Sequence, residues 1–355
     1  MAQITTIVPT YKRPALLKRA LASVLQQGYR DFEVHVCDNA SDDETPEVVG
    51  EFSRRDARVR YVRRERNVGM VPNFTEAMRA VRTPLFNILN DDDFLLPGFY
   101  EAAVKALRAV PEAQAFFGAI LYVSPEGRVV HSPAAFEKEG VRRPPELLGL
   151  VSSHTWPGVL FRTSLLETVG YLGENLTAAD TDFLWRITAR HAIIVSHQPV
   201  GVVILHPEGV SSAVERRRLL SDLRSMYDRV DEQRDLEPQS GVDLRRCISS
   251  AHFRMALQAL PFGEREAAVE AASVLRRKMG RPLLGILAQL LASRIAAPVS
   301  TALIRAGWKA QSRRRRIRCA AYDVFVAKAI RALDGWPRRG GFPEGQGPCV
   351  ESRES

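Results

Sequence analysis

Three consecutive carboxylates, Asp91, Asp92 and Asp93, follow an apolar stretch that runs from Pro84 to Leu89. Three adjacent carboxylates repel one another, and burying them without partners would cost free energy. A divalent cation among them relieves the repulsion, and carboxylate oxygens are hard ligands that suit Mg²⁺ or Mn²⁺. By itself, the triplet fits a metal site and an acidic, solvated turn equally well.

Strand and helix patterns alternate over the first 110 residues and place the triplet at a strand end. β-rich apolar runs predict strands over residues 4–9, 32–37, 59–62 and 84–89. Apolar residues at helical spacing, or a Pro at a helix start, predict helices over residues 14–28, 41–52, 72–81 and 97–110. Ser41 and Glu44 form a capping-box pattern for the second helix. This alternation predicts an α/β fold with a mostly parallel sheet flanked by helices.

Polar residues follow each predicted strand, and the carboxyl ends of parallel strands share one edge of a sheet. Tyr11 offers a stacking face after the first strand, and Asp38 offers an acceptor for a base or ribose after the second. Either Arg13 or Arg66 supplies a charge for a phosphate, on which the aspartate triplet would hold the metal. These residue types together predict a site for a nucleoside diphosphate.

Several other classes of site are disfavoured. The chain has neither a GxGxxG motif after the first strand nor a GxxxxGK[ST] motif, which argues against a dinucleotide-binding enzyme and a P-loop NTPase. Its four cysteines show no CxxC spacing, which argues against a zinc site and fits a reducing compartment. No basic segment followed by an apolar core precedes the first strand, so we expect a cytoplasmic protein.

An ordered set of motifs resembles a known family. The set comprises Ile7–Arg13, the Asp-containing end of the second strand, Asn67-x-Gly69, and Asp91-Asp92-Asp93-x-x-x-Pro97-Gly98. Each motif is weak alone, but in this order and at these intervals they resemble the inverting family 2 glycosyltransferases of the GT-A fold. The resemblance covers roughly residues 3–212.

The resemblance implies a nucleotide-diphosphate sugar donor, with UDP- and dTDP-sugars as the usual donors of such enzymes, and Mg²⁺ or Mn²⁺ as cofactor. Asp92 would be the principal carboxylate on the metal side, with Asp91 and Asp93 assisting. The family often has Asp where Asn90 stands, so the choice among the three carboxylates is open. The residues implied to contact the nucleotide sugar are Pro9, Thr10, Tyr11, Arg13, Asp38, Asn67, Gly69, Asn90 and Asp91.

A second acidic motif, Ala179–Arg186, resembles the family motif that opens a helix under the acceptor site. By this match Asp180 is the general base, which an acceptor hydroxyl needs because it is a poor nucleophile. The family commonly has Glu immediately before this Asp, where the chain has Ala179, so Asp182 is a second candidate. Without the resemblance, both carboxylates would simply fit the positive end of a helix dipole.

Two later residues complete the implied site. His206 resembles the family's late histidine, which lies near the metal or the leaving diphosphate, so it joins Asp92 and Asp93 as a candidate metal ligand. Trp156 falls in the segment that borders the acceptor pocket, where it could stack on a sugar ring. Packing in the core explains this Trp equally well.

The function implied is an inverting glycosyltransferase acting in cell-envelope glycan synthesis or secondary-metabolite glycosylation. Its acceptor would be a glycan, a lipid-linked molecule or a small molecule. The other function class is a non-catalytic nucleotide-sugar-binding module that kept the fold without turnover. The triplet together with Asp180 and His206 favours the enzyme.

Charge divides the chain into regions. Residues 1–210 carry 23 basic and 25 acidic side chains, whereas the rest carries 27 basic and 16 acidic ones. We expect a catalytic domain over residues 1–212, a basic helical region over 213–334, and a disordered Gly/Pro-rich tail over 335–355. The two larger regions are expected to meet different partners.

The basic region contains a largely apolar stretch, Leu283–Ile304, interrupted by Arg294. A charge in mid-stretch argues against a membrane span. Two interpretations are open: an amphipathic helix on the anionic inner face of the cell membrane, or a helical subdomain that packs on the catalytic domain. Few aromatic residues lie among the arginines, so nucleic-acid binding is disfavoured.

Overall fold

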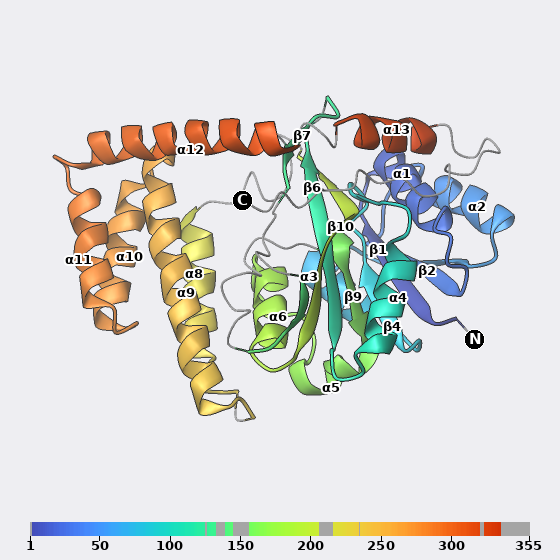
Figure 1. The fold of residues 1–355 in the computed structure, drawn as a ribbon, viewed down its shortest axis with the longest axis horizontal. Coiled ribbons are helices and arrows are strands. Elements are labelled where there is room, and N and C mark those ends of the chain that lie inside the picture. The colour runs from blue at the N-terminus through green and yellow to red at the C-terminus, as the bar shows by residue number, and fades with distance from the viewer. Residues whose placement is uncertain are drawn as a thin grey trace.

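A mixed ten-stranded sheet forms the centre of the described part of the chain (Figure 1). The computed structural model describes residues 2–124, 126–132, 139–144, 156–205, 216–233, 235–319 and 323–334. The strand order is β3-β2-β1-β4-β9-β6-β10-β5, with β7 beside β6 and β8 beside β10. The strands are β1 Ile4–Thr10, β2 Phe32–Asp38, β3 Val59–Arg63, β4 Leu85–Ile88, β5 Phe94–Leu95, β6 Ala115–Val123, β7 Val129–His131, β8 Gly140–Arg142, β9 Val159–Arg162 and β10 Ile193–Ile204.

Most central strands are parallel, as predicted. β1 pairs in parallel with β2 and β4, β2 pairs with β3, and β10 pairs with β6. β9 lies antiparallel between β4 and β6. Thr10 is the register partner of Asp38, and Ile7 that of Ile88, so the carboxyl ends of β1, β2 and β4 meet at one edge. The motifs of three separate loops therefore converge there.

Helices cover both faces of the sheet because successive strand residues point to opposite sides. Ile4 and Val8 of β1 share a core with α1, α2 and α4, whereas Ile7 shares the other core with α3 and α6. The helices around the sheet are α1 Pro14–Leu25, α2 Thr45–Arg55, α3 Met70–Arg79, α4 Phe99–Ala109, α5 Leu166–Val169 and α6 Ala179–Thr188.

One predicted helix start is wrong. Helix α2 begins at Thr45, and the side chain of its N-cap residue Glu44 makes no capping hydrogen bond; Asp43 Oδ1 accepts from the Thr45 amide at 3.0 Å. Ser41 instead accepts a hydrogen bond from the Lys12 amide at 2.9 Å and donates its own amide to Asp38. Ser41 therefore connects the loops after β1 and β2 and does not cap the helix.

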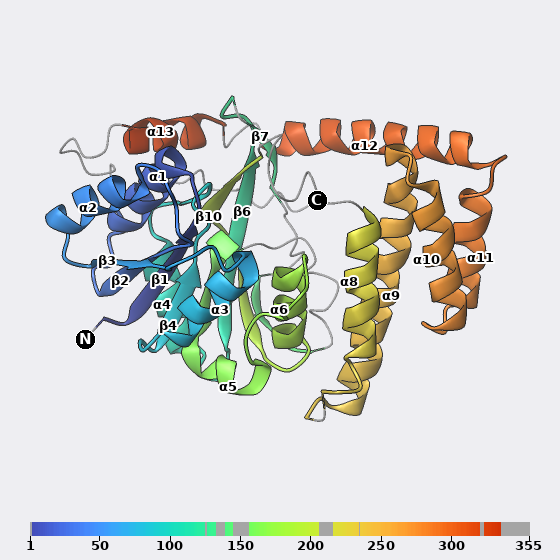
Figure 2. The ribbon, with the colours of Figure 1, turned by 180° about the vertical axis from the view of Figure 1, so that it is seen from behind.

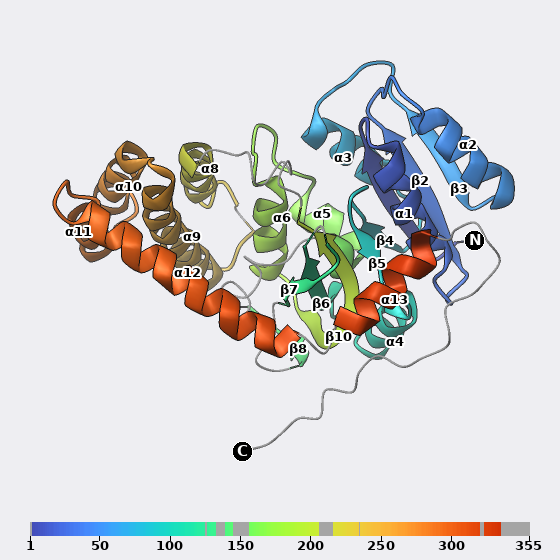
Figure 3. The ribbon, with the colours of Figure 1, turned by 90° about the horizontal axis from the view of Figure 1, so that it is seen from above.

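A helical region lies beside the sheet, next to α6 (Figures 1 and 2). Leu223 and Met226 of α8 belong to the same buried core as Phe183 of α6, so the region and the sheet are packed together. Helix α12 runs back past the ends of the other helices toward β7 (Figure 3). The helices are α8 Arg216–Asp228, α9 Pro238–Ala259, α10 Arg265–Arg277, α11 Pro282–Leu291 and α12 Ala297–Cys319.

The last described helix, α13 (Asp323–Asp334), returns to the sheet. Val326, Ala329 and Leu333 are buried in a cluster with Phe94 of β5 and Val202 of β10. The Asp323 carboxylate accepts a hydrogen bond from the Val129 amide at 2.8 Å. The predicted region 213–334 therefore has two parts, with α8–α12 beside the sheet and α13 upon it. The predicted tail, 335–355, lies outside the described residues.

Within the described ranges, no helix is both long enough and apolar enough to cross a membrane.

Candidate active site

A cleft of about 750 Å³ lies at the edge where the parallel strands end. One wall comes from the loops after β1, β2 and β4, and the other from the start of α6 and Leu219 of α8. The end of β10 and Tyr122 of β6 also line it. The predicted site residues that the fold brings to this cleft are Pro9, Thr10, Tyr11, Arg13, Asn67, Gly69, Asn90, Asp91, Asp92, Asp93, Trp156 and Asp180.

Two predicted residues lie apart from the cleft lining. Asp38 is fully buried, and its carboxylate accepts hydrogen bonds from the Ser41 amide at 2.9 Å and the Tyr61 hydroxyl at 2.6 Å. Asp182 is also buried and paired within the protein. His206 lies outside the described residues.

Asn39, one residue after Asp38, occupies the cleft wall. Its side chain donates to Asn67 Oδ1 at 2.9 Å and accepts from the Val68 amide at 2.9 Å. Asn67 Oδ1 also accepts from the amide of Gly69, whose φ of 90° favours glycine. The Asn39–Asn67 pair thus joins the loop after β2 to the start of α3. The sequence analysis assigned the nucleotide contact to Asp38, the charged neighbour of Asn39. In the structure Asp38 is the last residue of β2, and its carboxylate accepts from Tyr61 of β3.

The three aspartates of the triplet have three different environments. Asp93 is buried; it accepts from Asn90 Nδ2 at 3.0 Å and from the Ile204 amide at 3.3 Å. Burial, and then the charge of Asp92, raise the pKa of Asp93. The hydrogen bond from the Ile204 amide connects the loop that carries Asp93 to the end of β10. Asn90 supplies a hydrogen-bond donor to this buried carboxyl, which a carboxylate at that position would lack.

The guanidinium of Arg13 pairs with both Asp91 and Asp92. Arg13 lies 2.7 Å from Asp92 and 3.4 Å from Asp91, and Thr10 Oγ1 donates to Asp91 at 2.7 Å. Burial raises the pKa of Asp91 to about 6, against the Thr10 hydrogen bond, which lowers it. The Asp92 side chain is 18% exposed and that of Asp91 8%. Of the two carboxylates, Asp92 is therefore the more accessible to a ligand in the cleft.

A metal ion fits this donor set only with help from a ligand. No group of three or more His, Cys, Asp or Glu side chains could hold a metal ion within the described ranges. Mg²⁺, however, is usually held by one or two carboxylates together with substrate phosphates and water. Asp92 and Asp91 therefore suit a hard divalent cation whose remaining ligands come from a bound diphosphate.

The start of α6 separates the two candidate bases. Asp180 lines the cleft, and burial raises its pKa, opposed by hydrogen bonds from Thr181. Asp182 lies on the other side of the helix, where it pairs with Arg186 Nε at 2.9 Å and lies 3.9 Å from Arg229. The geometry gives Asp180 access to a substrate and gives Asp182 a structural ion pair.

Helix α8 holds the loop that carries Asp180. Asp222 is buried, and its carboxylate accepts from the amides of Thr177 and Ala178 at 2.8 and 2.9 Å. Ala178 is the N-cap residue of α6, so these bonds fix the backbone directly before Asp180. Asp222 lies beyond the family motifs, and only the packing of α8 against the sheet brings it here.

Trp156 is mainly a core residue. Its ring lies 6.0 Å from Phe183, 6.4 Å from Phe161 and 6.4 Å from Phe74, measured between ring centroids. Only 5% of the residue is exposed, although it contributes to the cleft wall. Such a ring supports the wall and offers little surface for stacking.

The comparisons with known proteins agree with this geometry. Residues 5–170 match the sequence model described as glycosyl transferase family 2. Over these residues the chain carries the sequence pattern of glycosyl transferase family 2. The matched segment contains the triplet and ends before Asp180, so the base candidate lies outside the family match.

An uncharacterized glycosyltransferase of Methanocaldococcus jannaschii is 23% identical over 192 residues, which are 52% of this chain and 64% of that protein. The chain thus spans less than two thirds of this relative's length.

Two solved glycosyltransferase structures share the GT-A fold. The TarS fragment of S. aureus, in complex with UDP-GlcNAc, has a TM-score of 0.65 and 20% identity, covering 86% of this chain and 92% of that one. The mannosyltransferase PcManGT of Pyrobaculum calidifontis, in complex with GDP-Man and Mn²⁺, has a TM-score of 0.53 and 19% identity, covering 91% and 87%. At such identity the likeness establishes the fold.

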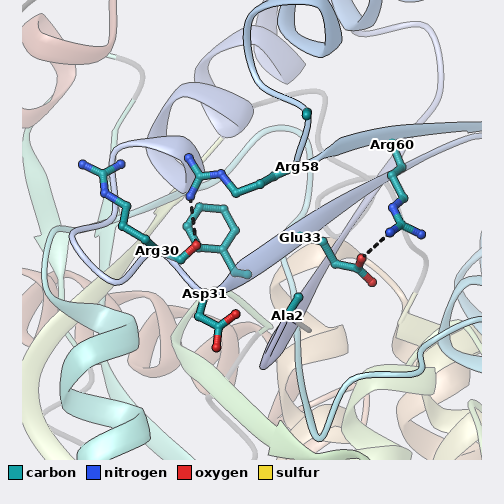
Figure 4. Close-up of a pocket in the computed structure, with 8 residues that line it drawn as sticks. Ala2, Arg30, Asp31, Glu33, Arg58 and Arg60 are labelled. Carbon is teal, nitrogen blue, oxygen red and sulfur yellow. Dashed lines mark hydrogen bonds and ion pairs between the residues drawn. The ribbon is translucent and has the colours of Figure 1, made fainter.

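A second hollow, of about 330 Å³, lies at the opposite, amino-terminal ends of β2 and β3 (Figure 4). Arg60 pairs there with Glu33 at 3.0 Å, and the Arg58 guanidinium lies 4.1 Å from the centre of the Phe32 ring. Its three arginines and Glu33 already have protein partners, so it is a poor candidate for a sugar-donor site.

Proposed function

We propose that this chain transfers a sugar from a nucleoside-diphosphate sugar to an acceptor hydroxyl, by a single displacement that inverts the anomeric centre. The observation that carries the proposal is the composition of one cleft. Asp92 and Arg13 line it at the carboxyl ends of the strands, and Asp180 lines it from the facing helix α6. This arrangement supplies charge for a leaving diphosphate and a base for a nucleophile.

On the donor side, Tyr11 is the exposed ring beside the strand ends and would stack on the nucleobase. The Asn39–Asn67 pair would offer amide groups to the base or ribose. Arg13, which pairs with Asp91 and Asp92 in this structure, would also bind the phosphates of the donor. The nucleotide sugars in the two similar structures support this donor class, with UDP, dTDP and GDP sugars as the first to test.

Asp92, with Asp91 beside it, would hold Mg²⁺ or Mn²⁺. When bound, the ion supplies positive charge that offsets the negative charge developing on the leaving diphosphate. The Mn²⁺ in the PcManGT complex supports the use of a divalent metal by this fold. Asp93 would hold the loop in place from the buried side, and His206 stays a candidate metal ligand by the family resemblance.

On the acceptor side, Asp180 would take the proton from the acceptor hydroxyl as its oxygen attacks the anomeric carbon. The bond from that carbon to the diphosphate oxygen breaks in the same step, and the electron pair leaves with the diphosphate. A carboxyl whose pKa is raised by burial is a stronger base than an ordinary Asp. Asp222 would keep this carboxyl aimed at the acceptor by holding the Thr177 and Ala178 amides.

The acceptor would enter between α6 and α8, where Thr177, Thr181 and Leu219 line the cleft. A glycan, a lipid-linked molecule or a small molecule would each fit this description. Cell-envelope glycan synthesis and secondary-metabolite glycosylation are the two biological settings we propose.

The test is a panel of nucleotide sugars with Mn²⁺ and purified full-length chain, read first by thermal shift and then by nucleoside-diphosphate release. We expect one donor to stabilise the protein and to turn over. Proton NMR of the product then reports whether the anomeric centre is inverted. Binding without any turnover, over a broad acceptor library, would instead identify a nucleotide-sugar-binding module.

A further inference from the structure

Helix α11 is packed the opposite way from an ordinary surface helix. Its small residues Gly285 and Ala288 are buried, while Leu283, Ile286 and Leu287 point to solvent, together with Leu290. A Cβ added at Gly285 would lie 2.6 Å from the Ala272 carbonyl oxygen of α10, so glycine is required for this close approach. Leu283 is 79% exposed. The large apolar side chains, at spacings of three and four residues, thus form a stripe on the outer face.

The next helix continues this apolar surface. Ile295 in the connection and Val299 and Leu303 of α12 recur every fourth residue, and Ile295 is 91% exposed. The two helices join at the end of the molecule away from the catalytic sheet (Figures 1 and 3). We call this surface the apolar corner; it consists of Leu283, Ile286, Leu287, Leu290, Ile295, Val299 and Leu303.

All charged residues in the segment that carries the apolar corner are basic. Residues 271–322 contain no Asp or Glu. Their twelve basic residues are Arg276, Arg277, Lys278, Arg281, Arg294, Arg305, Lys309, Arg313, Arg314, Arg315, Arg316 and Arg318. Arg277 and Arg294, which flank α11, are exposed. Apolar and cationic groups therefore occur together on the same part of the molecule.

We propose that the apolar corner inserts into the surface of an anionic phospholipid bilayer. This partner buries leucine and isoleucine in its acyl boundary and pairs with arginine through its headgroups. A nucleic acid would leave the apolar residues exposed to water. A second copy of the chain would bring two segments without acidic residues together, which their like charges oppose.

Vesicle flotation with the full-length chain tests the proposal. We expect the protein to float with phosphatidylcholine vesicles that contain phosphatidylglycerol, and to stay behind with phosphatidylcholine alone. The triple variant Leu283→Gln/Leu290→Gln/Ile295→Gln should lose about tenfold or more in partitioning. The matched control is Val242→Gln on α9, which removes an exposed apolar side chain outside the corner and should float like the parent.

The electrostatic part has its own variant. Arg277→Gln/Arg294→Gln should weaken binding to the anionic vesicles about tenfold, and added salt should weaken binding by the parent chain. All substituted side chains are exposed, so unfolding midpoints should match that of the parent. The assay contains no sugar donor, so its result is independent of the proposed reaction.

Two results would overturn the proposal. One is equal flotation of the parent and the triple variant, or none by either. The other is a dimer in analytical ultracentrifugation that the triple variant dissociates while vesicle binding is unchanged, since the corner would then belong to a second copy.

Discussion

The catalytic edge of the sheet and the helical region depart from ordinary packing in opposite ways. At the sheet edge, Asp38, Asp91 and Asp93 are buried, where apolar residues are usual. In the helical region, leucine and isoleucine side chains of α11 are exposed, where polar residues are usual. The contrast supports our two proposals, in which the sheet edge receives a charged sugar donor and the helical region meets an apolar boundary.

The two regions nevertheless share one interior. Leu223 and Met226 of α8 pack in the core of the sheet, and Asp222, directly before Leu223 in sequence, reaches the loop before Asp180. The two regions therefore differ in their surfaces but share one buried core. Each of the following predictions tests one side of it or the connection between them.

The largest effect is expected at Asp180. The Asp180→Asn variant should lose about 10²- to 10⁴-fold in kcat because the acceptor hydroxyl loses its base, with little change in donor binding. Single-turnover kinetics and a donor titration would measure both. The matched variant Asp182→Asn breaks a buried ion pair, so it should lower the free energy of unfolding by about 3 kcal/mol and change kcat far less. A reversed pattern would exchange the two roles.

Removal of the metal should have the next largest effect. Chelation with EDTA should abolish most transfer, and Asp92→Asn should remove the thermal stabilisation that Mn²⁺ gives together with a nucleoside diphosphate. The control is Asp42→Asn, an exposed carboxylate on the neighbouring loop, which should behave like the parent. Full activity after chelation would contradict a metal role at the triplet.

The pH dependence of kcat follows from the raised pKa of Asp180. A base acts when deprotonated, so kcat should rise with pH and reach its plateau only above the pKa of this carboxyl. Below that pKa the rate should fall by about tenfold for each pH unit, and the limb should lie above the pKa of an ordinary Asp. A kcat that stays constant down to the ordinary range of Asp would exclude Asp180 as the base.

The connection between the regions is tested at Asp222. Asp222→Asn replaces one acceptor oxygen with an amide that faces backbone N–H groups, so the loop before Asp180 should shift. We expect kcat to fall about 10-fold with the donor KM little changed, because the change displaces the base only. Asp228→Asn on the same helix, which pairs with Lys278 within the helical region, is the control. Equal effects of the two variants would remove the special role of Asp222.

The smallest effect is expected at Asn39. Asn39→Ala removes hydrogen bonds that join the β2 loop to Asn67 and Val68. The donor KM should rise about fivefold, as expected for roughly 1 kcal/mol, with kcat nearly unchanged. An unchanged KM would place the nucleotide away from this wall.

Much of the cleft could be predicted from sequence, because strand and helix patterns alternate and parallel strands end at a common edge. That reasoning placed Tyr11 and the aspartate triplet in one site and left Arg13 and Arg66 as alternatives, of which Arg13 lines the cleft. It named Asp38, whereas in the structure the neighbouring Asn39 lines the cleft and Asp38 is hydrogen-bonded to Ser41 and Tyr61. It also missed Asp222, whose contact is made across 44 residues of chain.

The sequence by itself determined which side chains lie at the strand ends, through the local periodicities that form strands and helices. Only the tertiary structure decided how each carboxylate is placed. Asp93 is buried and hydrogen-bonded to Asn90 and to the Ile204 amide, whereas Asp92 lines the cleft beside Arg13. Asp182 is paired with Arg186, whereas Asp180 lines the cleft. It also decided the orientation of α11. An apolar stripe has the same spacing whether it faces the protein or solvent, and here the close contact at Gly285 turns it outward.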